Sequence, residues 1–106
     1  MTTIFHRIIA REIPAHIIYE DDTYIVIKDI NPKMRIHRLI IPKATIPNFH
    51  SITSDSDKAI IRGLWDIARK LCDHYGITDV KFELNSGIPH QEVMQIHLHF
   101  LSQSAI

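Results

Sequence analysis

The sequence predicts an α+β domain in which several strands are combined with one long amphipathic helix. Apolar residues recur at helical spacing between Ser54 and Gly76. Farther on, residues 94–100 alternate polar with large apolar side chains, which is typical of a strand that buries one face and leaves the other open. At 106 residues, the chain is expected to form one domain, 1–106, with a core of its own.

The elements are expected in a simple order along the chain. A short first helix contains Phe5, Ile8 and Ile9 at helical spacing, and Pro14 is expected to end it. Two strands follow around a tight acidic turn, and Pro42 closes the third. The five strands are predicted at residues 17–20, 23–29, 37–41, 80–84 and 94–101.

The long helix is the most clearly delimited element. Ser54, Asp55 and Asp57 offer an N-cap and negative charge for its first turn, and Gly76 suits its C-terminal stop. Its apolar side chains cover more than one face, so they can serve both a core, where we expect Trp65, and an interface between subunits. They are Ile60, Ile61, Leu64, Trp65, Ile67, Ala68, Leu71, Cys72 and Tyr75.

Composition narrows the classes of function. Twelve Lys and Arg balance twelve Asp and Glu, so no bulk positive charge favours stable nucleic-acid binding. The single cysteine, Cys72, cannot form an internal disulfide, which fits a reducing compartment. His6 and Arg7 interrupt the N-terminus before an apolar run can form, so neither a signal peptide nor a membrane span is expected. These features predict a soluble, cytoplasmic protein.

The last predicted strand carries the candidate chemistry. Gln95, His97 and His99 share one face of it, because side chains alternate along a strand. Imidazole changes charge near neutral pH and can act as nucleophile, base or metal ligand. From the residues alone, two other interpretations remain open: ordinary half-buried histidines, or a His-x-His metal site with His37 or His90 as a third ligand.

A series of short motifs in fixed order links the chain to a known family. They are Arg11-Glu12-Ile13-Pro14-Ala15, Tyr19-Glu20-Asp21-Asp22, Asp29-Ile30-Asn31-Pro32, His37-Arg38-Leu39-Ile40-Ile41-Pro42-Lys43, Asn85, Gln91-Glu92-Val93 and His97-Leu98-His99. Through them the chain resembles the histidine-triad (HIT) superfamily, in its branch of nucleotide phosphoramidases and dinucleoside polyphosphate hydrolases. The resemblance implies a HIT-like fold, with a five-stranded antiparallel sheet per protomer and one long and one short helix.

The chain also departs from the family pattern. Gln95 occupies the first position of the His-x-His-x-His signature, Arg35-Ile36 replace small residues before the third strand, and Pro89-His90 replace the usual Ala-Gly. The cysteine pair that binds zinc in some members is absent. The Gln95 substitution weakens the case for full activity, and Gln95→His is expected to raise activity by restoring a third imidazole.

The resemblance implies a catalytic set of Gln95, His97 and His99. His97 would attack the α-phosphorus of a nucleotide and form a nucleotidyl-histidine intermediate that water then hydrolyses. A main-chain carbonyl near Gln95 would hold the other ring nitrogen of His97. His99 would contact the non-bridging phosphate oxygens and stabilise the developing charge.

The resemblance also implies a nucleotide-binding set. Asn85 and Gln91 would donate hydrogen bonds to phosphate, Asp29 would accept both ribose hydroxyls, and His37 would lie near the phosphate end, with Glu92 in the same group. An apolar slot for the base would complete it. Its expected members are Phe5, Ile8, Ile13, Ile27 and Ile30. Outside the resemblance, the favoured interpretation of Asp29 is a turn residue before Asn31-Pro32, and that of the isoleucines is plain core.

Two functions are consistent with these residues. The first is a hydrolase or transferase that cleaves at the α-phosphate of nucleoside phosphoramidates or dinucleoside polyphosphates, without metal or other cofactor. The second is a purine-nucleotide-binding module with little catalysis, because Gln95 replaces a histidine. In both, the partner is a purine nucleotide or nucleotide conjugate, and the protein is expected to form a homodimer through its long helix and the strand near Asn85, with no membrane association.

Overall fold

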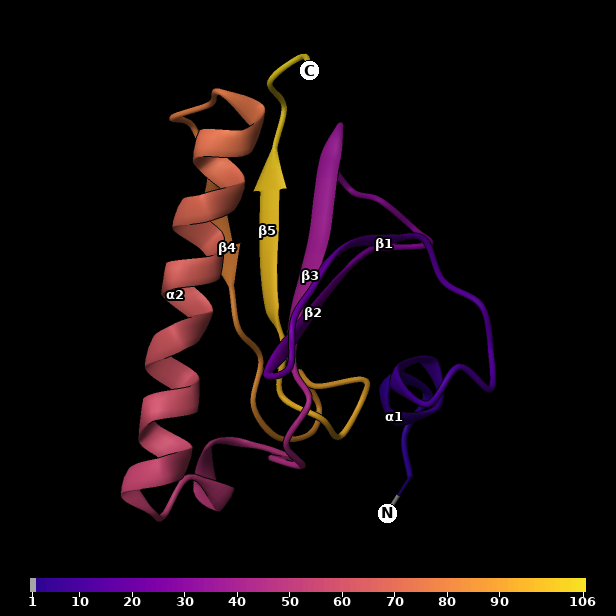
Figure 1. Cartoon of the computed structure of the whole chain (residues 1–106), viewed down its shortest axis with the longest axis vertical. Coiled ribbons are helices and arrows are strands. Elements are labelled where there is room, and N and C mark those ends of the chain that lie inside the picture. The colour runs from indigo at the N-terminus through magenta and orange to yellow at the C-terminus, as the bar shows by residue number, and fades with distance from the viewer. Residues whose placement is uncertain (1) are drawn as a thin grey trace.

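The computed structural model describes residues 2–106 and has the predicted α+β architecture. Its elements are α1 (Ile4–Ile9), β1 (Ile17–Glu20), β2 (Tyr24–Lys28), β3 (Ile36–Pro42), a 3₁₀ turn (Phe49–Ser51), α2 (Asp55–Tyr75), β4 (Lys81–Glu83) and β5 (Leu98–Ser102). The five strands form one antiparallel sheet in the order β1-β2-β3-β5-β4. The long helix α2 and the short helix α1 lie on opposite sides of this sheet (Figure 1).

Each face of the sheet has its own hydrophobic core, because alternate residues of a strand point to opposite faces. In β2, Tyr24 and Val26 belong to the core beneath α2, whereas Ile25 and Ile27 belong to the core beneath α1. The α2 core includes Ile36, Ile40, Leu64, Ile67, Ala68, Leu71, Ile77, Leu98 and Phe100. The α1 core includes Phe5, Ile8, Leu39 and Ile41. The face predicted to be open is therefore largely covered.

The prediction for α2 is confirmed at both ends. The Ser54 hydroxyl accepts a hydrogen bond from the Asp57 amide, and the Asp57 carboxylate accepts from the Ser54 amide. Gly76 ends the helix in the left-handed conformation, at φ 66°. Within residues 2–106, no helix has the combination of length and hydropathy that a membrane span requires.

The first helix ends earlier than predicted. Its N-terminus is fixed by a capping box between Thr3 and His6, and its last residue is Ile9 rather than the one before Pro14. Arg11 adopts a left-handed conformation at φ 63°, and the amides of residues 11 and 12 bond back to carbonyls of the helix. This is a Schellman motif with arginine in the position that glycine usually occupies, so no glycine marked the end in the sequence.

Two further predictions need correction. The last strand begins at Leu98 rather than Met94, because the preceding residues turn away to contact the segment after β3. Trp65 is not in the core of the single chain: its side chain is 48% exposed and packs edge-to-face on Phe82 of β4, with ring centroids 5.1 Å apart. Leu64, its neighbour in sequence, is the buried one.

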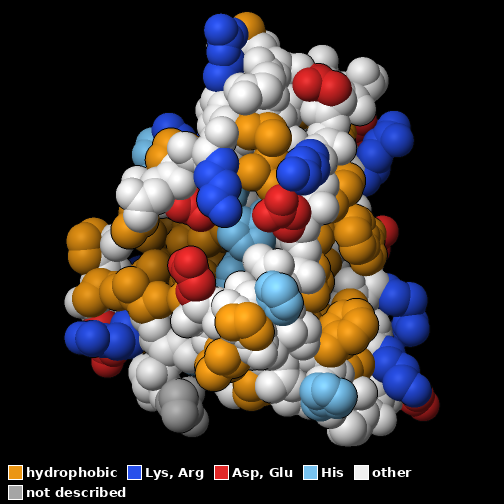
Figure 2. Space-filling model, turned by 180° about the vertical axis from the view of Figure 1, so that it is seen from behind, with side chains coloured by type: hydrophobic (Ala, Val, Ile, Leu, Met, Phe, Trp, Pro, Cys, Tyr) orange, Lys and Arg blue, Asp and Glu red, His pale blue; other side chains and the backbone are white. Residues whose placement is uncertain are grey.

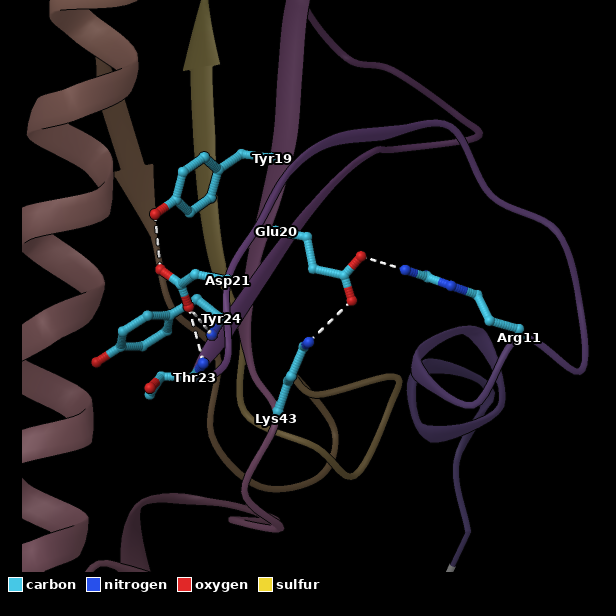
Figure 3. A network of polar contacts seen from close by, with 7 residues as sticks. All are labelled: Arg11, Tyr19, Glu20, Asp21, Thr23, Tyr24 and Lys43. Carbon is cyan, nitrogen blue, oxygen red and sulfur yellow. Dashed lines mark hydrogen bonds and ion pairs between the residues drawn. The ribbon is translucent and has the colours of Figure 1, made fainter.

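The turn between β1 and β2 is anchored to α2 through Tyr24. The Asp21 carboxylate accepts hydrogen bonds from the Tyr19 hydroxyl at 2.6 Å and from the amides of Thr23 and Tyr24 at 2.8 and 2.7 Å (Figure 3). The Tyr24 hydroxyl then donates to the Ile60 carbonyl in α2 at 2.6 Å. These bonds hold the edge of the sheet against the helix.

Gly63→Ala is expected to destabilise the fold, although alanine is favoured over glycine in a helix by about 1 kcal/mol. A Cβ at this position would overlap the Tyr24 hydroxyl and lie 2.8 Å from the ring carbon that carries it. We expect a lower melting temperature, measured by circular dichroism, and partial recovery in Gly63→Ala combined with Tyr24→Phe. A more stable Gly63→Ala would show that Tyr24 moves aside at no cost.

Candidate active site

A cavity of about 390 Å³ lies on the α1 side of the sheet. Figure 2 shows it as a hollow with pale-blue histidine surface at its floor and charged side chains on its rim. The lining residues come from α1, the end of β2 and the turn after it, β3, β5 and the segment between β4 and β5. Those that the sequence predicted are Phe5, Ile8, Ile27, Asp29, Ile30, His37, Asn85, Glu92, His97 and His99.

His97 is held in one tautomer by the main chain. Its Nδ1 lies 2.8 Å from the Gln95 carbonyl oxygen, which can only accept, so Nδ1 carries the proton and Nε2 keeps its lone pair. The ring is only 7% exposed, and the edge of the Phe5 ring packs on it with centroids 4.9 Å apart. Burial lowers the pKa of His97 below its ordinary value, although the Gln95 carbonyl and the Asp29 carboxylate oppose this. The result is a neutral imidazole with one unprotonated nitrogen at the cavity wall.

A second main-chain group fixes His37 and, through it, His99. The Lys33 amide donates to Nδ1 of His37 at 3.1 Å, so Nε2 of His37 carries the proton. This Nε2 lies 2.9 Å from Nδ1 of His99 and 3.4 Å from the Asp29 carboxylate. His99 therefore accepts at Nδ1 and has an Nε2–H to donate.

Burial keeps these rings uncharged. It lowers the pKa of His37, which is 1% exposed, although the Asp29 carboxylate opposes the shift. For His99, burial together with the neighbouring His97 and His37 lowers the pKa to about 4. Near neutral pH the site consequently offers hydrogen-bond donors and a lone pair rather than positive charge.

The cluster of Asp29, His37 and His99 also has the composition of a metal site, with one ligand atom of each within 4.8 Å of the others. A metal would need the lone pair of His37 Nε2, and that nitrogen would then have to lose its proton to Nδ1. Two N–H groups, of His37 and Lys33, would then face each other. The hydrogen bond from the Lys33 amide to His37 therefore favours a chain of hydrogen bonds from Lys33 through His37 to His99 over metal coordination at this cluster.

Gln95 is not placed as predicted. Its side chain is fully buried and bonds to the main chain of the segment after β3, with none of it lining the cavity. Only its carbonyl reaches the site, through His97. The premise that Gln95→His would add a third imidazole on the phosphate face is wrong, because the side chain at this position points into the interior.

Gln91 and Ile13 are also displaced from their predicted roles. The Gln91 side chain accepts from the Gly87 amide and donates to the carbonyls of Pro47 and Val93, so it fixes the loop that carries Asn85 and Glu92 instead of facing a ligand. Ile13 packs behind α1, outside the cavity. Ile30 does line the cavity, but it stands at the mouth with 87% of its side chain exposed.

The Asp29 side chain fits both interpretations left open by the sequence. Its Oδ1 accepts from the Asn31 amide at 2.8 Å, as in a turn, while its Oδ2 faces His37 and the cavity. One oxygen therefore shapes the turn and the other remains available.

Seven lining residues were not predicted as catalytic or nucleotide-binding from the sequence. They are Ile4, Lys28, Asn31, Lys33, Leu39, His90 and Val93. A signal existed for Ile4, which is one helical turn before Ile8, and for His90, which replaces a small residue of the family pattern. The role of the Lys33 amide had no signal, because any residue other than proline supplies a main-chain N–H.

Stability is expected to depend on the ionisation of His99. Its pKa is 6.5 in an unperturbed chain and about 4 in the fold, so the unfolded chain binds the proton first as the pH falls. The free energy of unfolding therefore decreases between pH 6.5 and 4, by on the order of 1–2 kcal/mol at pH 5 from this group. His99→Asn should show a smaller drop in melting temperature between pH 7 and 5. Equal drops in the two proteins would contradict the shift.

Comparisons with known proteins identify the family of this chain. The family model described as HIT domain matches residues 10–106. An uncharacterised HIT-like protein of Synechocystis is 41% identical over 101 residues, covering 93% of this chain and 88% of the relative. The purine nucleoside phosphoramidase of Escherichia coli K12 is 36% identical over 102 residues, covering 93% of this chain and 85% of the relative.

Solved structures of HIT proteins share the fold of this chain. A HIT family hydrolase from Legionella pneumophila superposes with a TM-score of 0.89 at 31% identity, covering 98% of this chain and 95% of its own. A histidine triad protein from Clostridium difficile superposes with a TM-score of 0.88 at 29% identity, covering 97% and 91%. The family match and the shared fold agree, and the chain belongs to the HIT domain family.

Proposed function

We propose that this protein is a nucleotide hydrolase or transferase that cleaves at the α-phosphate of purine nucleoside phosphoramidates or dinucleoside polyphosphates. The observation that carries the proposal is the state of His97, whose Nδ1–H is bound to the Gln95 carbonyl while Nε2 stays unprotonated at the cavity wall. A neutral imidazole in this state is a nucleophile. The name of the Escherichia coli relative, purine nucleoside phosphoramidase, supports the substrate class.

The chemical step follows from the tautomer. The Nε2 lone pair of His97 forms a bond to the α-phosphorus as the bond from phosphorus to the leaving nitrogen or oxygen breaks. The leaving group departs with that electron pair and takes up a proton. Water then attacks the same phosphorus and releases one proton to solvent, which balances the proton taken up by the leaving group; the P–Nε2 bond breaks, and the imidazole returns to its starting state, since the Gln95 carbonyl has held Nδ1–H throughout.

The groups around His97 can bind an anionic ligand through hydrogen bonds from uncharged donors. His99 has its Nε2–H to donate to a non-bridging phosphate oxygen, and Asn85 can donate from its amide. Asp29 offers the Oδ2 that faces His37 and the cavity to the ribose hydroxyls. The apolar wall formed by Phe5, Ile8 and Ile27 suits the faces of a purine base.

The competing possibility was a binding module, inactive because Gln95 replaces a histidine. That argument is weak, because the Gln95 side chain is buried and bonds to main-chain groups. The acceptor that His97 needs is the main-chain carbonyl of Gln95. The test incubates the protein with an adenosine phosphoramidate and follows amine release, together with trapping of a labelled, acid-labile histidine adduct. Nucleotide binding with no turnover and no adduct would make it a binding module.

His97→Ala is expected to reduce the hydrolysis rate by about 10³-fold or more while leaving AMP affinity within a few fold, because the ring acts in the chemical step. Stopped assays of amine release and calorimetric titration with AMP measure the two quantities. His74→Ala is the matched control, since His74 is exposed on α2 and outside the cavity. A loss of less than tenfold in His97→Ala would reject this residue as the nucleophile.

We further propose that the protein is a homodimer joined through α2 and β4. Strand β4 is an edge of the sheet, and the neighbouring surface exposes the aromatic pair Trp65 and Phe82. An unpaired edge beside exposed aromatic side chains is the kind of surface that a second copy covers around a two-fold axis.

Light scattering at low micromolar concentration should give about twice the chain mass of 12.3 kDa. Trp65→Glu is expected to shift the protein toward the monomer, because it places a charge in the centre of the paired surface. His74→Glu is the control: it lies nine residues farther along α2, about 900° of rotation and so on the opposite side. A wild-type mass near 12.3 kDa would refute the dimer.

A further inference from the structure

The Gln95 side chain uses every hydrogen-bonding atom of its amide in the interior. Its Nε2 donates to the carbonyls of Pro42 and Ala44 at 2.9 and 2.8 Å. Its Oε1 accepts from the Ile46 amide at 3.0 Å. Pro42 is the last residue of β3 and residues 43–46 have no regular structure, so these three bonds satisfy main-chain groups at and beyond the end of the strand.

Two contacts connect the 42–46 segment to helix α1. Lys43 lies 2.8 Å from the Glu20 carboxylate, which is also bound by Arg11 just after the helix (Figure 3). Thr45 lies 3.3 Å from Nε2 of His6, whose Nδ1 accepts from the amide of the helix N-cap. The segment therefore holds α1 near both of its ends.

Helix α1 in turn forms part of the candidate site. Ile4, Phe5 and Ile8 line the cavity, and the Phe5 ring packs on the His97 ring. With only six residues, α1 depends on such outside contacts for its position. Gln95 thus reaches the site by two routes, one through its carbonyl to His97 and one through its side chain to the wall that α1 provides.

We infer that Gln95 is a positioning residue that fixes the base-binding wall, and not a substitute for a catalytic imidazole. The inference rests on the proposed function for its kinetic consequence. The amide gives two donor hydrogens and one acceptor, which is what the 42–46 segment takes up. A neutral imidazole gives one donor and one acceptor, so histidine at this position leaves a buried main-chain group without a partner.

The kinetic test compares Gln95→His with Gln103→His, the same change at an exposed glutamine outside the cavity. For an adenosine phosphoramidate, we expect Gln95→His to raise KM about tenfold while kcat falls less than about threefold, because the carbonyl that orients His97 is main chain. Gln103→His should change neither. A rise in kcat with unchanged KM would overturn the inference and make Gln95 a stand-in for the imidazole.

Hydrogen exchange tests the same inference without any turnover. In Gln95→His, the Ile46 amide and the amides of α1 should exchange at least about tenfold faster than in wild type, whereas those of α2 should not change. Glu20→Gln, which weakens the contacts of Lys43 and Arg11, should accelerate exchange in α1 alone. If the wild-type protein hydrolyses no substrate, the proposed function is rejected, but the exchange rates still test whether Gln95 positions α1. Unchanged exchange at Ile46 and in α1 would overturn the inference.

Discussion

The hydrogen bond from Nδ1 of His97 to the Gln95 carbonyl is the interaction on which the site depends. A ring buried this deeply needs a partner for one nitrogen, and a carbonyl can only receive a proton. The other nitrogen is then left with its lone pair. The Lys33 amide instead donates to Nδ1 of His37. His37 therefore carries its proton on Nε2 and donates it to Nδ1 of His99. Two main-chain groups thereby set the protonation pattern of three rings.

This arrangement explains why the sheet is covered on both faces. A histidine in water near neutral pH divides its population between charged and neutral forms, whereas burial under α1 favours the neutral form. The side of the sheet that carries His37 and His99 is for this reason also a hydrophobic core, built from Phe5, Ile8 and residues of β2 and β3. Packing and chemistry are served by the same apolar side chains.

Much of the fold could be predicted from the sequence. The ends of α2 follow from its capping residues, the strands follow from local spacing, and the placement of His99 and Leu98 on opposite faces of β5 follows from strand alternation. The roles of Gln91 and Gln95 could not be predicted in this way. A glutamine can bind a ligand or a main-chain group equally well, and the partners of the Gln95 side chain, like Pro47 for Gln91, lie 44 to 53 residues earlier in the chain. The end of α1 escaped prediction for a different reason, since Arg11 takes the conformation that usually requires glycine.

The position of α1 has a consequence for how this fold can change its selectivity. The helix precedes the matched family region, which starts at residue 10, and it packs on the sheet through Phe5 and Ile8. The histidines are instead embedded in β3 and β5 and in the turn before β5. Under the proposed function, much of the wall that recognises the base and the residues that break the bond come from different segments of the chain. An N-terminal segment of altered sequence would retune ligand choice where it keeps an apolar ring over His97, because burial under α1 holds that histidine neutral.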